Sequence, residues 1–244
     1  MRRVVLITGG SRGIGAACVR LFAEQGWAVA FLYRSREEAA NALVEELRAR
    51  GYDATGYRCD VSDGGQVKAT VAEILRLYHR VDALVNNAGV AHMGLLTDMS
   101  EQDWNAVFSN NMGGVFHVTQ AVLPGMISRR QGSIVNVASM WGEVGASCEV
   151  AYSAAKAAVI GFTKALAKEV GPSGVRVNCV SPGLIATDMN AELDETALQE
   201  LADETPLGRV GTPEEVAQAA LYLAGDGAAF ITGQVLGVSG GLQI

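Results

Sequence analysis

Tyr152 and Lys156 are the two residues in this chain whose types and spacing most directly suggest chemistry. A separation of four residues puts two side chains on one face of a helix, so both can act at one point. A phenol with a pKa near 10 is a poor acid or base at neutral pH, whereas a neighbouring ammonium favours the phenolate. Ser139 follows a predicted strand, and its hydroxyl could hold a substrate carbonyl oxygen on the same rim. The set indicates acid–base chemistry at a carbonyl.

A glycine-rich stretch near the N-terminus is the second feature with a chemical meaning. Residues 8–15 read Thr-Gly-Gly-Ser-Arg-Gly-Ile-Gly, after an apolar run and before a helical pattern. Such glycines let the backbone approach a pyrophosphate at a helix N-terminus, where free N–H groups favour an anion. The spacing differs from the general G-x-G-x-x-G fingerprint, and glycine-rich turns also join strands to helices without a ligand. We expect a dinucleotide site here, with contacts from Gly9, Ser11, Arg12, Gly13, Ile14 and Gly15.

The same glycine stretch also satisfies the G-x-S-x-G pattern of a hydrolase nucleophile, with Ser11 as the serine. That fold needs a histidine late in the chain and several strands before the serine. The last histidine is His117, and one strand is predicted before Ser11. The sequence therefore argues against a serine hydrolase.

The end of the second predicted strand indicates which cofactor binds. An NAD-binding chain usually carries an acid there to bond the ribose 2′-hydroxyl. This chain instead reads Tyr33-Arg34-Ser35-Arg36. Arg34, together with Arg12 from the glycine loop, could clamp a 2′-phosphate, although both could also be solvated surface charges. The sequence favours NADP(H), with Arg34 and Ser35 as contacts.

These residues need a scaffold, and the hydrophobic pattern predicts one. Short apolar runs rich in Val and Ile alternate with amphipathic segments, which predicts a seven-stranded, doubly wound parallel sheet with helices on both faces. The predicted strands are 4–8, 28–33, 54–59, 83–86, 133–138, 175–180 and 234–238. The predicted helices are 13–26, 37–50, 64–79, 101–129, 150–170 and 213–225. With no linker or repeat, residues 1–244 are expected to form one α/β Rossmann domain, with a lid at about 184–212.

Composition excludes several other classes. The net charge of −7 and the scattered basic residues argue against nucleic-acid binding. The four cysteines form no Cys-x-x-Cys pair and have no histidine at ligand spacing, so we expect no metal site and a reducing compartment. The apolar run after Arg3 is too short for a signal peptide, and no stretch is long enough to span a membrane. A cytoplasmic protein without membrane partners is expected.

Taken in order, the motifs resemble those of the short-chain dehydrogenase/reductase superfamily along the whole chain. They are Thr8-Gly9-x3-Gly13-x-Gly15, Asp60-Val61, Asn86-Asn87-Ala88-Gly89, Asn111, Ser139, Tyr152-x3-Lys156 and Pro182-Gly183. The resemblance implies that Tyr152 is the general acid in carbonyl reduction and that Ser139 orients the carbonyl. It implies that Lys156 bonds the nicotinamide ribose and lowers the pKa of Tyr152. Asn111 would hold a water that links Lys156 to solvent.

The resemblance also implies the remaining cofactor contacts and an assembly. Asp60 and Val61 would contact the adenine, and Asn87, Ala88 and Gly89 would line a ribose. Residues after the sixth strand would meet the carboxamide, namely Pro182, Gly183, Ile185 and Thr187. The segments 101–129 and 150–170 would form dimer faces within a homotetramer.

Within the superfamily, the sequence is most similar to the 3-oxoacyl-[acyl-carrier-protein] reductases of fatty-acid synthesis. The similarity rests on residues 8–15, 181–189 and 230–241. It implies a 3-oxoacyl thioester substrate and an acidic carrier protein, for which Arg129 and Arg130 are the expected docking residues. Ser173 stands where these reductases often carry a basic residue, and the predicted lid is acidic, which weakens that interpretation.

Glu149 is a further departure, because these reductases often have Gln there. We expect it to line the substrate pocket with Met140, Trp141, Cys148 and His92. A carboxylate in that place would suit a cationic or amine-bearing ketone. Residues 139–150 are also similar to relatives that reduce a ketone on a modified lysine of elongation factor P. An alcohol or sugar dehydrogenase and a non-catalytic NADP-binding regulator stay open as alternatives.

Overall fold

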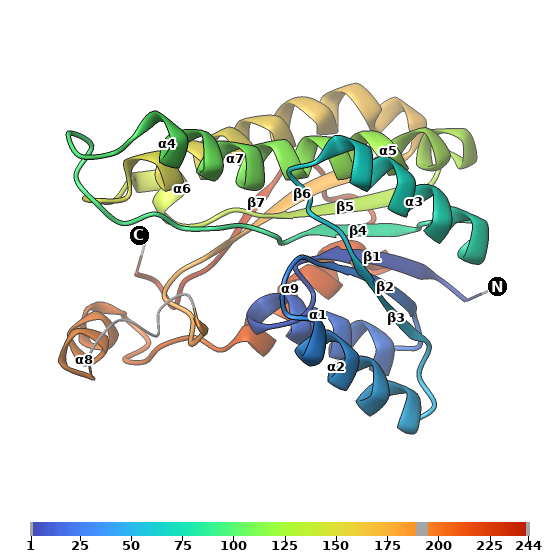
Figure 1. Cartoon of the computed structure of the whole chain (residues 1–244), viewed down its shortest axis with the longest axis horizontal. Coiled ribbons are helices and arrows are strands. Elements are labelled where there is room, and N and C mark those ends of the chain that lie inside the picture. Colours follow the sequence, from blue (N-terminus) through green and yellow to red (C-terminus); the bar gives the residue numbers. More distant parts are fainter. Residues whose placement is uncertain (1, 189–194, 243–244) are drawn as a thin grey trace.

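A parallel sheet of seven strands forms the centre of the computed structural model, which describes residues 2–188 and 195–242 (Figure 1). The strand order is β3-β2-β1-β4-β5-β6-β7, and every neighbouring pair is parallel. The strands are β1 (Val4–Thr8), β2 (Ala28–Tyr33), β3 (Ala54–Arg58), β4 (Ala83–Asn86), β5 (Gly132–Val137), β6 (Val175–Pro182) and β7 (Val235–Val238). The chain reverses its direction of winding between β1 and β4, which in such sheets opens a crevice at the carboxyl ends of the strands.

Helices cover both faces of the sheet. The helices α1, α2 and α9 lie on one face, and α3, α4, α5 and α7 lie on the other (Figure 1). Their bounds are α1 (Gly13–Glu24), α2 (Glu37–Ala49), α3 (Gly64–Tyr78), α4 (Glu101–Phe108), α5 (Gly114–Arg129), α6 (Trp141–Val144), α7 (Val150–Val170), α8 (Glu195–Glu204) and α9 (Pro213–Ala224). The predicted fold class is confirmed.

The two cores follow from the alternation of side chains along each strand. In β1, Val5 and Ile7 pack with α1 and α9, while Leu6 points to the opposite layer, which contains α3, α5 and α7. All three side chains are completely buried. Because successive strand residues face opposite sides, a strand between two helical layers must be apolar throughout, as the sequence of β1 is.

A buried polar network ties the centre of the sheet to two helices. The Nδ2 of Asn86 in β4 donates to Oδ1 of Asn136 in β5 at 2.9 Å and to Oγ1 of Thr119 in α5 at 3.1 Å. The Nδ2 of Asn136 donates in turn to Oγ1 of Thr163 in α7 at 2.8 Å. Buried hydrogen bonds between side chains hold a specific alignment, because an unpaired partner would be costly. The network therefore fixes α5 and α7 against β4 and β5.

The predicted helix 101–129 is divided in the structure. Between α4 and α5, the residues Ser109–Gly113 form a π-helical turn, here called η1. The π turn adds one residue to a helical turn while the helix continues, so the apolar pattern of the sequence does not reveal it. The short helix α6 and the helix α8 were not predicted.

The predicted lid is only partly within the described residues. Helix α8 lies inside 184–212, and the base of this segment is joined by a parallel bridge between Ile185 and Gly211. Residues 189–194 lie outside the described part, so the lid stays a prediction. Among the residues that the structure describes, no helix has the length and apolar character needed to cross a bilayer.

Candidate active site

The glycine loop between β1 and α1 is shaped by close backbone contacts. A Cβ atom on Gly15 would lie 2.0 Å from the carbonyl oxygen of Gly9, which no side chain could accommodate. Gly9 and Gly13 have φ angles of +67° and +51°, a conformation that favours glycine. Ser11 and Arg12 occupy the turn between them, and Ile14 enters the helix. The loop that the sequence predicted is therefore formed.

Within the described residues, the N-terminus of α1 has no side-chain cap from its N-cap residue. Arg12 is the N-cap residue and makes no side-chain capping bond, and the first turn carries no acidic residue. The first N–H groups of a helix are left without intrahelical partners and carry a partial positive charge. The guanidinium of Arg12 lies 3.3 Å from Asp188, and both side chains are exposed. This helix end is suited to hold an anion.

The loop after β4 is fastened to the glycine loop. Oγ1 of Thr8 accepts hydrogen bonds from the backbone N–H groups of Asn87 and Ala88, both at 2.9 Å. The Nδ2 of Asn87 donates to the carbonyl oxygens of Thr8 at 3.0 Å and Gly9 at 3.2 Å. The predicted contacts Asn87, Ala88 and Gly89 thus stand beside the glycine loop. Thr8, which carries this arrangement, was recognised in the motif but not predicted as a functional residue.

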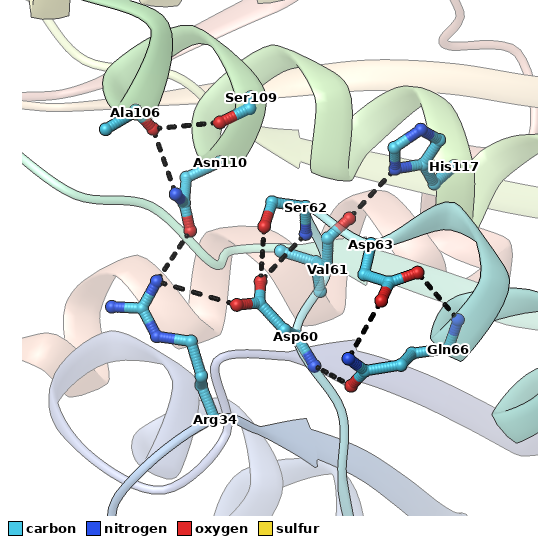
Figure 2. A network of polar contacts seen from close by, with 10 residues as sticks. All are labelled: Arg34, Asp60, Val61, Ser62, Asp63, Gln66, Ala106, Ser109, Asn110 and His117. Atoms are coloured by element: carbon cyan, nitrogen blue, oxygen red, sulfur yellow. Dashed lines mark hydrogen bonds and ion pairs between the residues drawn. The ribbon is translucent and has the colours of Figure 1, made fainter. Parts of the chain in front are cut away.

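At the other end of the crevice, Arg34, Asp60 and Asn110 lie together (Figure 2). The Nη1 of Arg34 donates to Oδ1 of Asn110 at 3.1 Å and lies 4.0 Å from Oδ2 of Asp60. Ser35 is exposed at the end of β2. Val61 is buried, and its carbonyl oxygen lies 3.0 Å from Nδ1 of His117. The predicted Arg34, Asp60 and Val61 are brought to one place, and Asn110 joins them unpredicted.

Helix α7 brings Tyr152 and Lys156 under the rim where β5 ends. The hydroxyl of Ser139 lies near that of Tyr152 and lowers its pKa, and it accepts from the N–H of Trp141 at 3.2 Å. Lys156 Nζ lies 5.6 Å from the Tyr152 ring centroid and donates to the carbonyl oxygen of Val137 at 2.8 Å. Tyr152, Lys156 and Ser139 are all buried. The three residues predicted to act together are therefore brought together.

Burial shifts the pKa values of Tyr152 and Lys156 in opposite directions. It raises the pKa of Tyr152 to about 12, with a contribution from the carboxylate of Glu149 and a partial offset from the Ser139 hydroxyl. It lowers the pKa of Lys156 to about 8. In the protein alone, desolvation of the buried phenol determines the direction of the Tyr152 pKa shift, and the expected lowering of this pKa by Lys156 stays a prediction. Tyr152 is consequently a protonated donor at neutral pH.

The π-helical turn η1 directs Asn111 into the protein. The side chain is completely buried, and its amide exchanges two hydrogen bonds of 2.8 Å with the backbone of Val90. A Cβ atom on Gly89 would lie 2.8 Å from Oδ1 of Asn111 and 3.5 Å from Nζ of Lys156. Glycine at this position thus leaves space that both side chains border, which brings Asn111 into the same cluster as the Tyr152–Lys156 pair.

The residues predicted for the nicotinamide end follow β6. Pro182 is the last residue of that strand, and a Cβ atom on Gly183 would lie 2.7 Å from the Cα of Ser239. Ile185 is buried, and Thr187 stands opposite the glycine loop, 3.4 Å from where a Cβ atom of Gly13 would be. This segment therefore passes close to the start of α1.

The predicted substrate-pocket residues lie around the start of α7. Met140 is buried, Trp141 begins α6, and Glu149 precedes α7 as its N-cap residue. Partial burial raises the pKa of Glu149. His92 lies on the loop before α4, where its Nδ1 is 4.0 Å from Oδ1 of Asp103. The carbonyl oxygen of Cys148 accepts from the N–H of Gly94 at 2.8 Å, which joins this loop to the rim.

Arg129 and Arg130 do not lie at the mouth of this site. They stand at the end of α5, at the edge of the sheet where the strands begin. Arg129 Nη2 donates to the carbonyl oxygen of Val81 at 2.7 Å, and Arg130 Nη2 donates to that of Pro172 at 2.9 Å. The expectation that they serve the mouth of the site in their own chain is wrong, since a helix of 16 residues carries them to the opposite edge.

Two clefts mark the two edges of the sheet. One, of about 500 Å³, is bordered by the glycine loop, α1, α2 and residues 186–188. The other, of about 580 Å³, lies at the opposite edge, where Arg3 and Arg80 pair with Asp226 and Asp82. Neither cleft is lined by Ser139, Tyr152 or Lys156. We place the chemistry at the carboxyl edge of the sheet, where the glycine loop follows β1 and Ser139 follows β5. No group of three or more metal-ligating side chains occurs within residues 2–188 and 195–242.

Comparison with known proteins agrees with this geometry. The family model described as enoyl-(acyl carrier protein) reductase matches residues 9–243. A 3-oxoacyl-[acyl-carrier-protein] reductase FabG of Chlamydia trachomatis is 44% identical over 243 residues, covering 99% of this chain and 98% of the relative. The chain belongs to the short-chain dehydrogenase/reductase family. The FabG of Thermotoga maritima is 46% identical over 242 residues, with the same coverage of both chains.

A solved structure has the same fold as this chain. It is a variant of actinorhodin polyketide ketoreductase determined with NADPH, with a TM-score of 0.95 and 39% identity. The match covers 99% of this chain and 97% of that one. The protein is thus a short-chain dehydrogenase/reductase related to the FabG enzymes over its full length.

Proposed function

We propose that this protein is an NADPH-dependent reductase that converts a 3-oxoacyl thioester, carried on an acyl carrier protein, into the 3-hydroxyacyl form. The observation that carries the proposal is the buried Tyr152, with Ser139 beside its hydroxyl and Lys156 Nζ 5.6 Å from its ring centroid. The names of the FabG relatives support the choice of substrate, and the NADPH in the related ketoreductase supports the choice of cofactor.

The residues present fit a phosphorylated dinucleotide. The uncapped start of α1 would hold the pyrophosphate, and Arg34, with Arg12, would hold the 2′-phosphate. Asp60 and Val61 would meet the adenine, and Asn87, Ala88 and Gly89 would line a ribose. When bound, NADPH supplies the hydride for reduction. The segment with Pro182, Gly183, Ile185 and Thr187 would meet the nicotinamide.

The protein's own groups would supply the proton and hold the substrate. Ser139 would donate to the carbonyl oxygen, and Tyr152, protonated at neutral pH because burial raises its pKa to about 12, would transfer its proton to that oxygen. Lys156, with a pKa of about 8, would return a proton to Tyr152. Asn111 keeps one amide proton and one lone pair beyond its bonds to Val90, enough to hold a connecting water.

The deciding experiment is a substrate panel run with NADPH, with oxidation of the cofactor followed by absorbance. The panel contains carrier-bound 3-oxoacyl thioesters, free thioesters and amine-bearing ketones. We expect the carrier-bound thioesters to have the highest kcat/KM, and Tyr152→Phe to lower kcat by about a hundredfold or more, as for loss of a general acid. Unchanged NADPH affinity in this variant serves as the control for folding. Full activity of Tyr152→Phe would refute the mechanism.

One observation favours a second candidate, an amine-bearing ketone such as that on a modified lysine of elongation factor P. Glu149 places a partly buried carboxylate three residues before Tyr152, and a neutral thioester offers it no partner. Under this alternative, Glu149→Gln lowers kcat/KM selectively for amine-bearing ketones. Glu143→Gln is the matched control, because it removes the same charge from exposed α6. Equal effects of Glu149→Gln on both substrate classes remove this candidate.

The same panel separates the remaining classes. An alcohol or sugar dehydrogenase would use the same residues in the oxidative direction and would turn over alcohols with the oxidised cofactor. A non-catalytic regulator would bind NADPH and show no turnover in either direction. We further infer a cytoplasmic protein that forms one domain and assembles as a homotetramer through α4, α5 and α7, with 184–212 as a lid.

A further inference from the structure

The π-helical turn η1 presents two consecutive asparagines in different directions. Asn111 points inward, and its amide is bonded to the backbone of Val90. Asn110 is only partly buried and points across the crevice to Arg34 (Figure 2). Single π turns inside helices frequently mark functional sites. Here the turn lets one short segment serve both the catalytic cluster and the end of the crevice where β2 and β3 finish.

The contact between Asn110 and Arg34 is directed rather than accidental. The Nδ2 of Asn110 donates to the carbonyl oxygen of Ala106 at 2.9 Å, one helical turn earlier. This bond sets which way the amide is turned, so Oδ1 faces Arg34 and accepts from its Nη1 at 3.1 Å. The two residues are 76 positions apart in the chain and come from opposite walls of the crevice.

Asp60 lies near Arg34 but does not replace Asn110 as its hydrogen-bond partner. Its Oδ1 accepts from both the N–H and the hydroxyl of Ser62, at 2.9 and 2.7 Å. Its Oδ2 lies 4.0 Å from the same Nη1 of Arg34, which is longer than a hydrogen bond. The partner within hydrogen-bond distance of Arg34 is therefore the neutral amide of Asn110, while the carboxylate of Asp60 forms a longer ion pair with the same Nη1.

The rest of the guanidinium is left available. Both contacts of Arg34 with the described residues use Nη1, so Nη2 and Nε make no hydrogen bond within that part of the chain. A guanidinium offers a planar fork that binds phosphate through two parallel N–H groups. About half of the Arg34 side chain (52%) is exposed, so an untethered arginine here would lose considerable rotamer freedom when it grips a ligand.

We infer that Asn110 is a positioning residue for cofactor selection: it holds Arg34 in place, through Nη1, for the 2′-phosphate of NADPH. The inference rests on the proposed NADPH-dependent function. Asn110 acts through Arg34 and not on the cofactor itself. Part of the ordering that phosphate binding requires is thus made before the cofactor arrives, which improves affinity for NADPH alone.

The test measures equilibrium binding of NADPH and of NADH to the purified protein by nucleotide fluorescence. Asn110→Ala is expected to weaken NADPH binding about three- to tenfold, the range set by ordering one flexible side chain, and to leave the Kd for NADH unchanged. NADH is an internal control, because a folding defect would weaken both cofactors. An equal loss for both, or no loss for NADPH, overturns the inference.

Ser109→Ala is the matched control variant. Its hydroxyl donates to the same carbonyl oxygen of Ala106, at 3.3 Å, but it does not contact Arg34 (Figure 2). The Kd values for both cofactors should be unchanged in this variant. A selective loss of NADPH affinity in Ser109→Ala would show that the helical turn matters in place of the Asn110 contact, and would refute the inference.

Arg34→Ala separates this inference from the proposed function. We expect it to weaken NADPH binding about tenfold or more, as for a lost hydrogen bond to a charged group, and Asn110→Ala should then add nothing in the double variant. If Arg34→Ala leaves the preference for NADPH intact, the proposed 2′-phosphate clamp is wrong. If Arg34→Ala is selective and Asn110→Ala is not, only the role of Asn110 is wrong.

Discussion

At the scale of single residues, burial reverses the order in which Tyr152 and Lys156 lose their protons, because in water the phenol, with a pKa of 10.0, would lose its proton just before the ammonium, with a pKa of 10.5. Burial raises the phenol pKa to about 12 and lowers that of the ammonium to about 8. Lys156 therefore gains and loses its proton close to neutral pH, whereas Tyr152 keeps its proton until a substrate oxygen accepts it. This division suits a donor that must be recharged after each turnover.

The lowered pKa of Lys156 has a consequence for stability that can be measured. The native state releases this proton near pH 8 and the unfolded chain near 10.5, so the unfolded state binds more protons between these values. Stability must then rise with pH across that window, and the gain lies near 3 kcal/mol, or about 1.4 kcal/mol per pKa unit. We expect the free energy of unfolding of the wild type, relative to Lys156→Met, to increase by about this amount from pH 8 to 10.5.

Urea unfolding of the two proteins at several pH values provides the measurement. Comparison with Lys156→Met cancels the effects of groups whose pKa values do not depend on Lys156, such as Cys18, whose thiol pKa burial raises to about 12. A difference that stays constant with pH would show that Lys156 keeps an ordinary pKa in the folded protein.

Among single residues, those that share a helix face could be predicted from the sequence, whereas pKa shifts and contacts between distant segments could not. The spacing of Tyr152 and Lys156 was enough to place them together, because helical geometry fixes which residues share a face. The direction of the Tyr152 pKa shift was not accessible, since it depends on burial that only the packed structure provides. Asn110 was missed for a related reason, because its partner Arg34 comes from a distant strand and the two meet only through the sheet order.

At the scale of elements, the glycine loop shows how a turn limits its own sequence. Gly15 stands in the first turn of α1, and the backbone of Gly9 closes over it. At Gly161, within α7, a Cβ atom would meet no described atom within 4 Å apart from its chain neighbours and the nearby backbone of its own helix. Two glycines in helices therefore differ sharply in what they tolerate.

Gly15→Ala is expected to destabilise the protein by about 1–3 kcal/mol, the usual cost of overpacking, and to abolish NADPH binding by displacing the loop. Gly161→Ala, the matched control, should fold and keep the wild-type Kd for NADPH. Urea unfolding and fluorescence titration measure the two effects. Normal NADPH affinity in Gly15→Ala would mean that the turn does not form the pyrophosphate site.

The seven strands were predicted within two residues at their ends, because runs of Val and Ile between helical patterns are typical of buried parallel strands. The division of 101–129 was not predictable, since a π turn changes the hydrogen bonds and leaves the apolar pattern continuous. Helix α8 was also missed, in a segment whose many acidic residues resemble a loop in composition.

At the scale of the whole molecule, the two edges of the sheet differ in character. The carboxyl edge carries the Tyr152 cluster and the glycine loop, whereas the amino edge carries Arg129, Arg130 and the arginines of the second cleft. Helix α5 precedes β5 and ends where that strand begins, so Arg129 at its C-terminus lies at the amino edge and not at the expected mouth of the site. The assembly expected through α4, α5 and α7 concerns a third surface, the outer helical layer.

Phe116 provides a test of that assembly, because it is a large apolar side chain on α5 that is 45% exposed. We expect the wild type to have four times the chain mass of 25.5 kDa in light scattering, and Phe116→Glu to form smaller species, since a buried unpaired charge opposes association. Leu77→Glu is the control, as Leu77 is 55% exposed on α3. A wild type that is monomeric at all concentrations would rule out the tetramer.

The register of β4 against β5 is selected by the buried polar network of Asn86, Asn136, Thr119 and Thr163. If β5 slipped by one residue against β4, Asn136 would turn to the opposite face of the sheet, and Asn86 and Thr163 would lose their hydrogen bonds to it. Ser139 follows Asn136 by three residues, and Thr163 lies on the helix that carries Tyr152. A sheet with the wrong register would thus be unstable as well as inactive. The hydrogen bonds that select the correct register also set the distance between the Ser139 hydroxyl and the Tyr152 phenol.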